Sequence, residues 1–234
     1  MKEHEDTIVK ERILKRIFDI VVSAFFLLLL SPLFLAFALL LKLEGLINPF
    51  FKGPVFFKSI RISRGKEFTM YKFRTVNYDT YLFLEKDKMR RSITEFICSA
   101  NNKEYLTPVG AFLDKIYFDE LPQLYNVLKG DMSMVGPRPH IIEHYNNDIK
   151  EGITSAKYIK GGILGLVQAS KKNPKMQEVF KRMALKHFSK DKSLEVTERL
   201  YFQRYLRASA VELLLFDIWI IYRCLLVVLA AKGI

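Results

Sequence analysis

One long apolar segment near the N-terminus constrains this chain more than any other feature. Residues 20–41 include no charged side chain, and a helix of that length would roughly cross the ~30 Å hydrocarbon core of a bilayer. The segment is long for a signal peptide, contains a central proline and lacks a small-residue cleavage pattern before Lys42. We therefore expect a membrane insert that stays on the mature protein.

Two features bear on the topology of this segment. Pro32 removes a backbone donor and can bend the helix, while the Ser31 hydroxyl can satisfy a carbonyl freed at the break. Basic residues flank both ends: Lys10, Arg12, Lys15 and Arg16 before it, and Lys42, Lys52, Lys58, Arg61, Arg64 and Lys66 after it. Both ends then look cytoplasmic under the positive-inside rule, which suits a re-entrant hairpin. Proline also kinks ordinary spanning helices, so the residues alone leave both topologies open.

The charge of the chain favours anionic partners. Its 234 residues suit one principal domain, and 37 Lys and Arg against 25 Asp and Glu give a formal net charge of +12. Nucleic acid, phosphorylated substrates and acidic lipid headgroups all fit that charge, and charge alone does not choose among them. The two cysteines form no Cys-x-x-Cys pair, so we expect no zinc site.

The rest of the chain is predicted to be mainly helical. Residues 53–57 and 68–73 read as two short strands of a hairpin around the turn at residues 63–66. Helices are predicted over residues 81–100, 119–128 and 175–206. Residues 211–231 are apolar but interrupted by charges, and we expect them to be buried or interfacial.

Asp119 and Glu120 stand side by side at a predicted helix start. Asp119 occupies the position of an N-cap, and Pro122 is tolerated in the first turn, so one interpretation is a cap with an acidic first turn. The other interpretation is catalytic. A helix start stabilises ionised carboxylates and can host phosphate, so one acid could act as a nucleophile while the other holds a divalent cation.

Basic residues elsewhere could bind phosphate. Arg138 lies between Pro137 and Pro139, and a stiffly presented guanidinium can bind a phosphate bidentately, although a rigid surface turn has the same sequence. Lys72 and Arg74 are two apart on a predicted strand and would share one face as a basic rim, or be solvated edge charges. We expect His140 and His144, one helical turn apart, to be surface residues.

Several motifs occur together in an order that resembles one family. They are Lys15-Arg16-Ile17-Phe18-Asp19, Ser31-Pro32, Gly53-Pro54-Val55-Phe56-Phe57, Tyr71-Lys72-Phe73-Arg74-Thr75, Asp119-Glu120-Leu121-Pro122-Gln123-Leu124, Asn126-Val127-Leu128-Lys129-Gly130-Asp131-Met132-Ser133 and Gly136-Pro137-Arg138-Pro139. This order is similar to that of the bacterial sugar transferases, the monotopic phosphoglycosyl transferases. The resemblance runs from Ile13 to the C-terminus.

The resemblance implies an enzyme of the bacterial inner membrane, on its cytoplasmic face. Family members transfer a sugar 1-phosphate from a nucleotide diphosphosugar, usually a UDP-sugar, to polyprenyl (undecaprenyl) phosphate. They release UMP and so start cell-surface glycan synthesis, such as exopolysaccharide or capsule. By resemblance, Asp119 is the catalytic nucleophile that carries the phosphosugar, and Glu120 is catalytic and binds Mg²⁺. Substrate phosphates would meet four residues: Arg138, Pro137, Lys72 and Arg74.

For the fold, the resemblance implies an α/β, mostly helical, single globular domain with a small β-hairpin. Residues 1–45 would form a basic amphipathic start and a re-entrant membrane helix-break-helix, broken at Ser31 and Pro32. Residues 46–234 would form the interface-bound catalytic domain. Expected partners are a UDP-sugar, polyprenyl phosphate and membrane lipids but no nucleic acid, and a homodimer is left open.

The chain also departs from the family pattern. Asp114 and Tyr117 stand where the family tends to have arginine and serine, Gly161 replaces a usual proline, and Lys171-Lys172 replaces a usual Gly-Arg. These departures motivate an alternative, a catalytically weak relative that serves as a membrane scaffold in a glycan assembly complex. The sequence does not identify the sugar, the polyprenol or the glycan.

Overall fold

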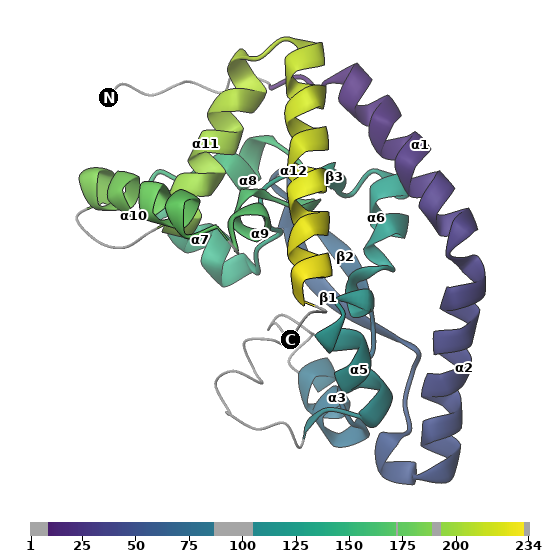
Figure 1. Ribbon diagram of the computed structural model, residues 1–234. Helices are drawn as coiled ribbons and strands as arrows, with labels where there is room; N and C mark the ends of the chain where they lie inside the picture. Colours follow the sequence, from purple (N-terminus) through teal and green to yellow (C-terminus); the bar gives the residue numbers. More distant parts are fainter. Residues whose placement is uncertain (1–8, 87–104, 172, 189–192, 232–234) are drawn as a thin grey trace.

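The chain begins, in the computed structural model, with two helices joined by a sharp bend. The structure describes residues 9–86, 105–171, 173–188 and 193–231. Helix α1 (Ile13–Leu29) and helix α2 (Ser31–Ile47) meet at an angle of 58° and form one edge of the molecule (Figure 1). The Ser31 hydroxyl donates to the Leu28 carbonyl at 2.8 Å, and Pro32 lies in the first turn of α2, where its missing N–H leaves no gap. The helix is therefore interrupted where Ser31-Pro32 predicts a break.

The surface of this bent pair is strongly apolar. Val21 and Phe25 on α1, and Leu35 and Leu39 on α2, are all more than half exposed. In the described part of the chain, no helix on its own has the length and apolar character to cross a membrane, whereas α1 and α2 together do as a bent pair. An exposed apolar surface of this extent marks an interaction site.

A β-hairpin follows the short 3-10 helix η1 (Pro49–Phe51). Strands β1 (Phe56–Ser63) and β2 (Lys66–Phe73) pair antiparallel. Arg64 and Gly65 form the two-residue turn with φ of 51° and 71°, a conformation whose twist matches that of the flanking strands. The predicted hairpin is confirmed, although β1 begins after Pro54, which has no N–H to donate to a strand partner.

The acidic pair lies in a tight turn before a helix. After α3 (Tyr78–Lys86) and α5 (Pro108–Lys115), the 3-10 helix η3 (Phe118–Glu120) precedes α6 (Gln123–Lys129). Neither η3 nor α6 has a side-chain cap, so the interpretation of Asp119 as a helix cap is wrong. Tyr117 has a left-handed φ of 60° and Pro122 cannot donate an N–H, so the chain turns before the helix starts. Of the helix predicted over residues 81–100, everything after residue 86 lies outside the described residues.

Two short parallel strands sit at the centre. Strand β3 (Ser133–Val135) pairs with β4 (Gly162–Leu164), and α7 (Ile142–Lys150) and α8 (Ser155–Tyr158) lie between them in the chain. The backbones approach so closely that a Cβ on Gly162 would lie 2.1 Å from the backbone nitrogen of Gly136. Only glycine fits there, and no pattern in the sequence predicts this pair of strands.

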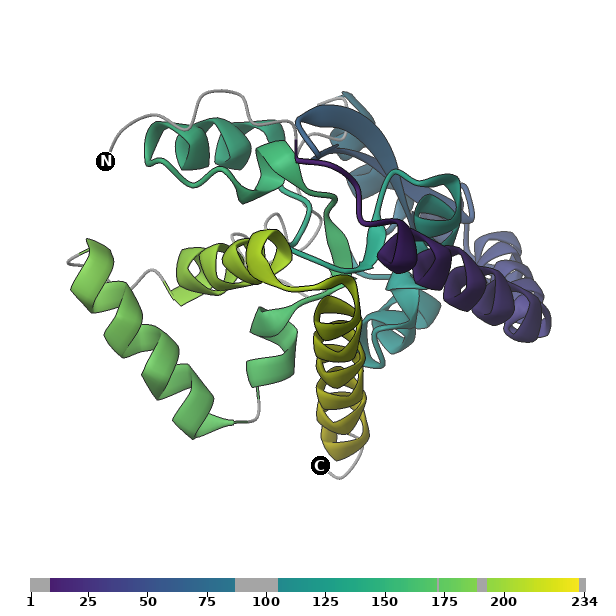
Figure 2. The same cartoon turned by 90° about the horizontal axis from the view of Figure 1, so that it is seen from above.

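The remaining helices enclose the centre. They are α9 (Leu166–Ser170), α10 (Pro174–Phe188), α11 (Ser193–Arg207) and α12 (Ala210–Ala231). Seen from above, α10 and the bent pair lie on opposite sides of the molecule, with α12 between them (Figure 2). One face of α12 is buried through Leu213, Asp217 and Ile220, while Leu215 and Ile218 are exposed. The prediction for residues 175–206 is confirmed as two helices.

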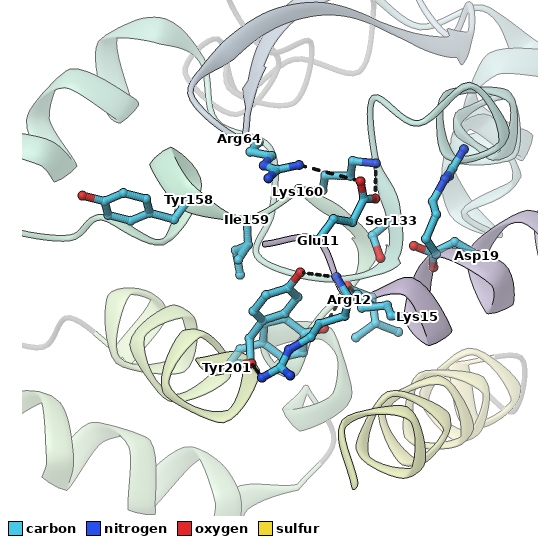
Figure 3. Close-up of a pocket in the computed structure, with 13 residues that line it drawn as sticks. Glu11, Arg12, Lys15, Asp19, Arg64, Ser133, Tyr158, Ile159, Lys160 and Tyr201 are labelled. Atoms are coloured by element: carbon cyan, nitrogen blue, oxygen red, sulfur yellow. Dashed lines mark hydrogen bonds and ion pairs between the residues drawn. The ribbon is translucent and has the colours of Figure 1, made fainter. Parts of the chain in front are cut away.

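Buried polar contacts hold the start of α1 against the centre. The Lys15 ammonium donates to Asp217 Oδ2 on α12 at 2.5 Å and to the Val135 carbonyl on β3 at 2.9 Å. Asp19 accepts the backbone N–H of Met134 at 2.9 Å. The cavity beside these residues, shown in Figure 3, is only about 20 Å³. A cavity of this size is too small for a sugar nucleotide. The polar contacts around it hold α1 in place.

Candidate active site

Lys72 draws the two adjacent acids into one cluster. Its ammonium on β2 lies 3.2 Å from Asp119 Oδ2 and 2.7 Å from Glu120 Oε1. All three side chains are largely buried, with exposed fractions of 12% for Lys72, 7% for Asp119 and 19% for Glu120. The hairpin therefore presents one cation to two carboxylates that follow each other in η3.

Arg138 reaches the same cluster from another loop. Its guanidinium Nη2 lies 3.3 Å from Glu120 Oε1, and its side chain is 51% exposed. Pro137 and Pro139 on either side are buried, and the Pro137 carbonyl accepts the Gly162 N–H at 2.7 Å. The buried Pro137, whose own carbonyl is bonded to Gly162, thus anchors the loop from which the exposed Arg138 side chain extends.

Gly161, one of the departures from the family pattern, packs closely against this loop. A Cβ on Gly161 would lie 2.6 Å from Pro139 Cγ, so a residue with a side chain there must push the proline aside. In this chain Gly161 and Pro139 fit each other. Gly161 therefore leaves room for Pro139 in the loop that presents Arg138.

The two carboxyl groups of the cluster titrate differently. Burial raises the pKa of Asp119 to about 6, with the negative charge of Glu120 adding to the effect and Lys72 opposing it. For Glu120, burial acts in the same direction but is outweighed by Lys72 and Arg138, which hold its pKa down at about 2. At neutral pH both groups are mainly ionised, and Asp119 holds the more basic carboxylate of the pair.

The structure corrects the expected basic rim. Arg74 follows the last residue of β2 and is fully buried. Its guanidinium donates to three backbone carbonyls: Pro54 at 2.9 Å, Val76 at 2.6 Å and Phe51 at 2.7 Å. Because its donors are already engaged inside the fold, Arg74 forms no exposed rim with Lys72. The strand-alternation argument failed because the regular strand ends at Phe73.

A second polar cluster lies beside Arg138. His140 Nδ1 is 2.6 Å from Asp148 Oδ2, and His140 Nε2 is 2.8 Å from Glu198 Oε1. Although burial opposes it, bonding to both carboxylates raises the pKa of His140 to about 10. The expectation of a surface histidine is therefore wrong for His140. Sequence spacing could not reveal Glu198, which comes from α11.

This cluster lines a cavity of about 470 Å³ between α7, α9 and α11. Its walls are Arg138, His140, His144, Asn147, Asp148, Glu151, Val167, Gln168, Lys171 and Glu198. The volume lies within the range of roughly 300–1,000 Å³ typical of small-molecule sites. Arg138 belongs both to this cavity and to the acidic cluster, and so links the two.

Two groups of donors could hold a divalent cation. Ligand atoms of His140, Asp148 and Glu198 lie within 4.8 Å of one another, but a cation there would have to displace the proton shared between imidazole and carboxylates. Asp119 and Glu120 offer carboxylate oxygens, the ligands that Mg²⁺ prefers, and Mg²⁺ commonly uses only one or two protein carboxylates together with substrate phosphates. The acidic pair therefore fits Mg²⁺ by the chemistry of its donors.

Comparison with known proteins identifies the family. The family model described as bacterial sugar transferase matches residues 10–231. The chain therefore belongs to the bacterial sugar transferase family, and the resemblance drawn from its motifs is confirmed.

Individual relatives agree with this assignment. The chain is 38% identical over 170 residues to the undecaprenyl-phosphate galactose phosphotransferase of Salmonella typhimurium, covering 69% of this chain and 33% of that protein. It is 38% identical over 160 residues to the UDP-glucose:undecaprenyl-phosphate glucose-1-phosphate transferase of Escherichia coli, covering 67% of this chain and 31% of that protein. It is 35% identical over 159 residues to an uncharacterised sugar transferase, EpsL, of Bacillus subtilis, covering 64% of this chain and 69% of that protein. The chain thus spans about a third of the length of the first two relatives.

Proposed function

We propose that this chain is a polyprenyl-phosphate glycosyl-1-phosphate transferase. It takes a sugar 1-phosphate from a UDP-sugar, places it on polyprenyl phosphate and releases UMP, as the first step in building a cell-surface glycan. Membership of the sugar transferase family and the activities for which two relatives are named support this proposal. The observation that carries it is the Lys72 ammonium held between the carboxylates of Asp119 and Glu120.

Asp119 is the proposed nucleophile. One of its carboxylate oxygens bonds to the sugar-bearing phosphorus, the bond from that phosphorus to the bridging oxygen breaks, and UMP leaves with the bridging oxygen and its electron pair. The phosphosugar is then attached to Asp119 as an acyl phosphate. An oxygen of polyprenyl phosphate attacks the same phosphorus, the bond to the carboxylate breaks, and Asp119 returns in its ionised form.

The neighbouring side chains divide the remaining work. Glu120 stays ionised and would hold Mg²⁺, which when bound neutralises charge on the diphosphate. Arg138 is half exposed and offers its planar guanidinium to a phosphate. Lys72 is close enough to Asp119 to meet the phosphate that Asp119 attacks, which places a cation where negative charge gathers.

We also propose that the bent pair α1 and α2 is a re-entrant hairpin in the cytoplasmic leaflet of the inner membrane. Its exposed apolar surface and the 58° bend support this placement. Basic residues on both sides of the apolar segment favour the same compartment for both ends. The lipid phosphate would then lie near the surface on which the catalytic domain rests.

The test is a screen of the purified protein in detergent. Wild-type protein, Mg²⁺ and undecaprenyl phosphate are incubated with a panel of UDP-sugars, and UMP and the lipid-linked sugar phosphate are measured. We expect one or a few donors to release UMP in equal amount to the lipid product. Release from no donor would contradict the transferase proposal and favour the scaffold alternative.

A further inference from the structure

Two departures from the family pattern lie in contact beside the acidic pair. The Lys171 ammonium sits over the ring of Tyr117, 5.3 Å from its centroid. This is within the ~6 Å reach of a cation–π contact, and such contacts contribute little to stability at exposed sites. Both residues differ from the family pattern, and they lie 54 positions apart in the sequence, so the sequence alone does not predict their contact.

The backbone places Tyr117 at the edge of the active site. Tyr117 precedes Phe118-Asp119-Glu120 and takes a left-handed φ of 60°, while its side chain is 47% exposed. Its N–H donates to the Asp114 carbonyl at 3.1 Å, which ties the turn to the end of α5. The Tyr117 backbone is therefore held two residues before Asp119, and the half-exposed ring carries the Lys171 ammonium on one face.

Lys171 also belongs to the cavity that Arg138 shares with the acidic cluster. Arg138 approaches this cavity from the β3 side and Lys171 from the end of α9. Of the three acids on the cavity wall, Asp148 and Glu198 are paired with His140, and Glu151 lies just after α7. Besides the His140 imidazolium, which is paired with two carboxylates, the cavity wall therefore carries two further cations, Arg138 and Lys171.

A diphosphate matches this arrangement of charge. The proposed donor carries two adjacent phosphates, one attacked by Asp119 and one that leaves with the nucleoside. Arg138 contacts Glu120 and is the nearer of the two cations to the acids. Arg138 and Lys171 both line the cavity of about 470 Å³, a volume within the range typical of small-molecule sites.

We infer that Lys171, held on the ring of Tyr117, binds the nucleotide-side phosphate of the donor, with the nucleoside in the cavity between α7, α9 and α11. The inference rests on the proposed function. It makes Lys171 a substrate-binding residue and Tyr117 its positioning residue. The lipid acceptor carries a single phosphate, which meets the phosphosugar at Asp119, so it needs no second phosphate contact at Lys171.

The test compares Lys171→Ala with a matched control. Lys157 makes the same type of contact with Tyr158, at 5.2 Å, on α8 and outside the cavity wall. We expect Lys171→Ala to raise the KM for the UDP-sugar about tenfold, with kcat and the KM for undecaprenyl phosphate nearly unchanged. Lys171→Arg should restore most of the affinity, and Lys157→Ala should behave as wild type. An unchanged donor KM in Lys171→Ala, or an equal rise in Lys157→Ala, would overturn the inference.

A double-mutant cycle tests the role of Tyr117. Tyr117→Leu replaces the ring with a shorter apolar side chain, and it should raise the donor KM by a smaller factor than Lys171→Ala. In the double variant the two effects should not multiply, because Tyr117 acts through Lys171. Fully multiplicative effects would show that Tyr117 does not position Lys171.

Direct binding separates this inference from the proposed function. UDP is titrated calorimetrically into wild-type and Lys171→Ala protein with Mg²⁺. Binding to wild type that weakens about tenfold in Lys171→Ala supports the nucleotide contact even if no donor releases UMP. Equal binding to both proteins, or binding to neither, would overturn it.

Discussion

The ring of Phe37 on α2 meets the ring of Phe118 edge-on, with centroids 6.1 Å apart. Phe118 is the residue before Asp119, so the second arm of the bent pair packs directly behind the acidic pair. The first arm contacts the same segment at its other end. Arg16 on α1 donates to the carbonyls of Val127 at 2.6 Å and Leu128 at 2.8 Å, in the last turn of α6.

This packing predicts a joint effect of Phe37→Ala on stability and chemistry. Phe37 is 6% exposed, and deleting a buried phenylalanine costs about 3–5 kcal/mol of unfolding free energy. The rate of adduct formation on Asp119 should also fall, because Phe118 loses its support. Thermal unfolding in detergent and single-turnover UMP release measure the two effects. Leu35→Ala, on the same helix but 63% exposed, is the control and should change neither by much.

Removing the proposed nucleophile should abolish turnover without unfolding the protein. Asp119→Asn keeps the size of the side chain but not its charge, so UMP release should fall by orders of magnitude. Intact-mass analysis after mixing with donor alone should show a phosphosugar adduct on wild type and none on the variant. Asp79→Asn, at the exposed start of α3, should retain both. Near-normal turnover in Asp119→Asn would reject the assignment.

The pH dependence should follow Asp119. Attack requires the ionised carboxylate, and burial raises the pKa of Asp119 to about 6, so kcat/KM for the donor should fall as pH decreases through about 6. Glu120→Gln removes a like charge that raises the pKa of Asp119. The pH at which kcat/KM falls, the acid limb of the profile, should therefore be lower in this variant. Lys72→Met removes an opposite charge and should move it to higher pH. Stopped-flow UMP release from pH 5 to 8 measures the limb, and shifts of the reverse sign would contradict the assignment.

Arg74 is expected to support the fold. Arg74→Lys cannot reach all three carbonyls at once, and leaving buried polar groups unpaired should cost roughly 3 kcal/mol of unfolding free energy. The donor KM of the folded fraction should stay unchanged. Chemical unfolding and steady-state kinetics on the same preparation distinguish the two roles. Wild-type stability with a raised donor KM would instead assign Arg74 to substrate binding.

The proposed re-entrant topology predicts where both ends of the bent pair lie. A cysteine placed at Lys10, in a background with Cys98 and Cys224 changed to serine, should be protected from an impermeant thiol reagent in sealed cells and labelled after lysis. A cysteine at Asp79 in the catalytic domain is the reference and should behave identically. Labelling at position 10 in sealed cells, with protection at position 79, would establish a spanning helix.

Local patterns in the sequence predicted the local structure well. The Arg64-Gly65 turn and the alternation around it predict a hairpin, and Ser31-Pro32 predicts the position of a helix break. The predicted helix start at Asp119 was misplaced because the backbone turns at Tyr117. An aromatic residue rarely takes a positive φ, so the sequence does not indicate this turn. Patterns of short range could not foresee that β2 would end before Arg74.

The candidate site was predictable in its parts but not in its assembly. Asp119, Glu120 and Arg138 could be selected from the sequence by their chemistry and motifs. Lys72 could be selected as a basic residue on a strand and as part of a family motif. Its place between the two acids could not be predicted, because that depends on how the hairpin packs against η3 and α6. Partners such as Glu198 for His140 come from distant helices, and only the tertiary structure brings them together.

The contacts of α1 and α2 with the two ends of the η3–α6 segment have a physical consequence for a protein seated in lipid. Hydrophobic mismatch between a helix and its bilayer is relieved by tilting. If the bent pair is embedded as proposed, a tilt of either arm is transmitted through Phe37 or Arg16 to the segment that carries Asp119. Acyl-chain length of the surrounding lipids thereby becomes a variable of the reaction, with the bend acting as a mechanical link between bilayer thickness and the position of the attacking oxygen.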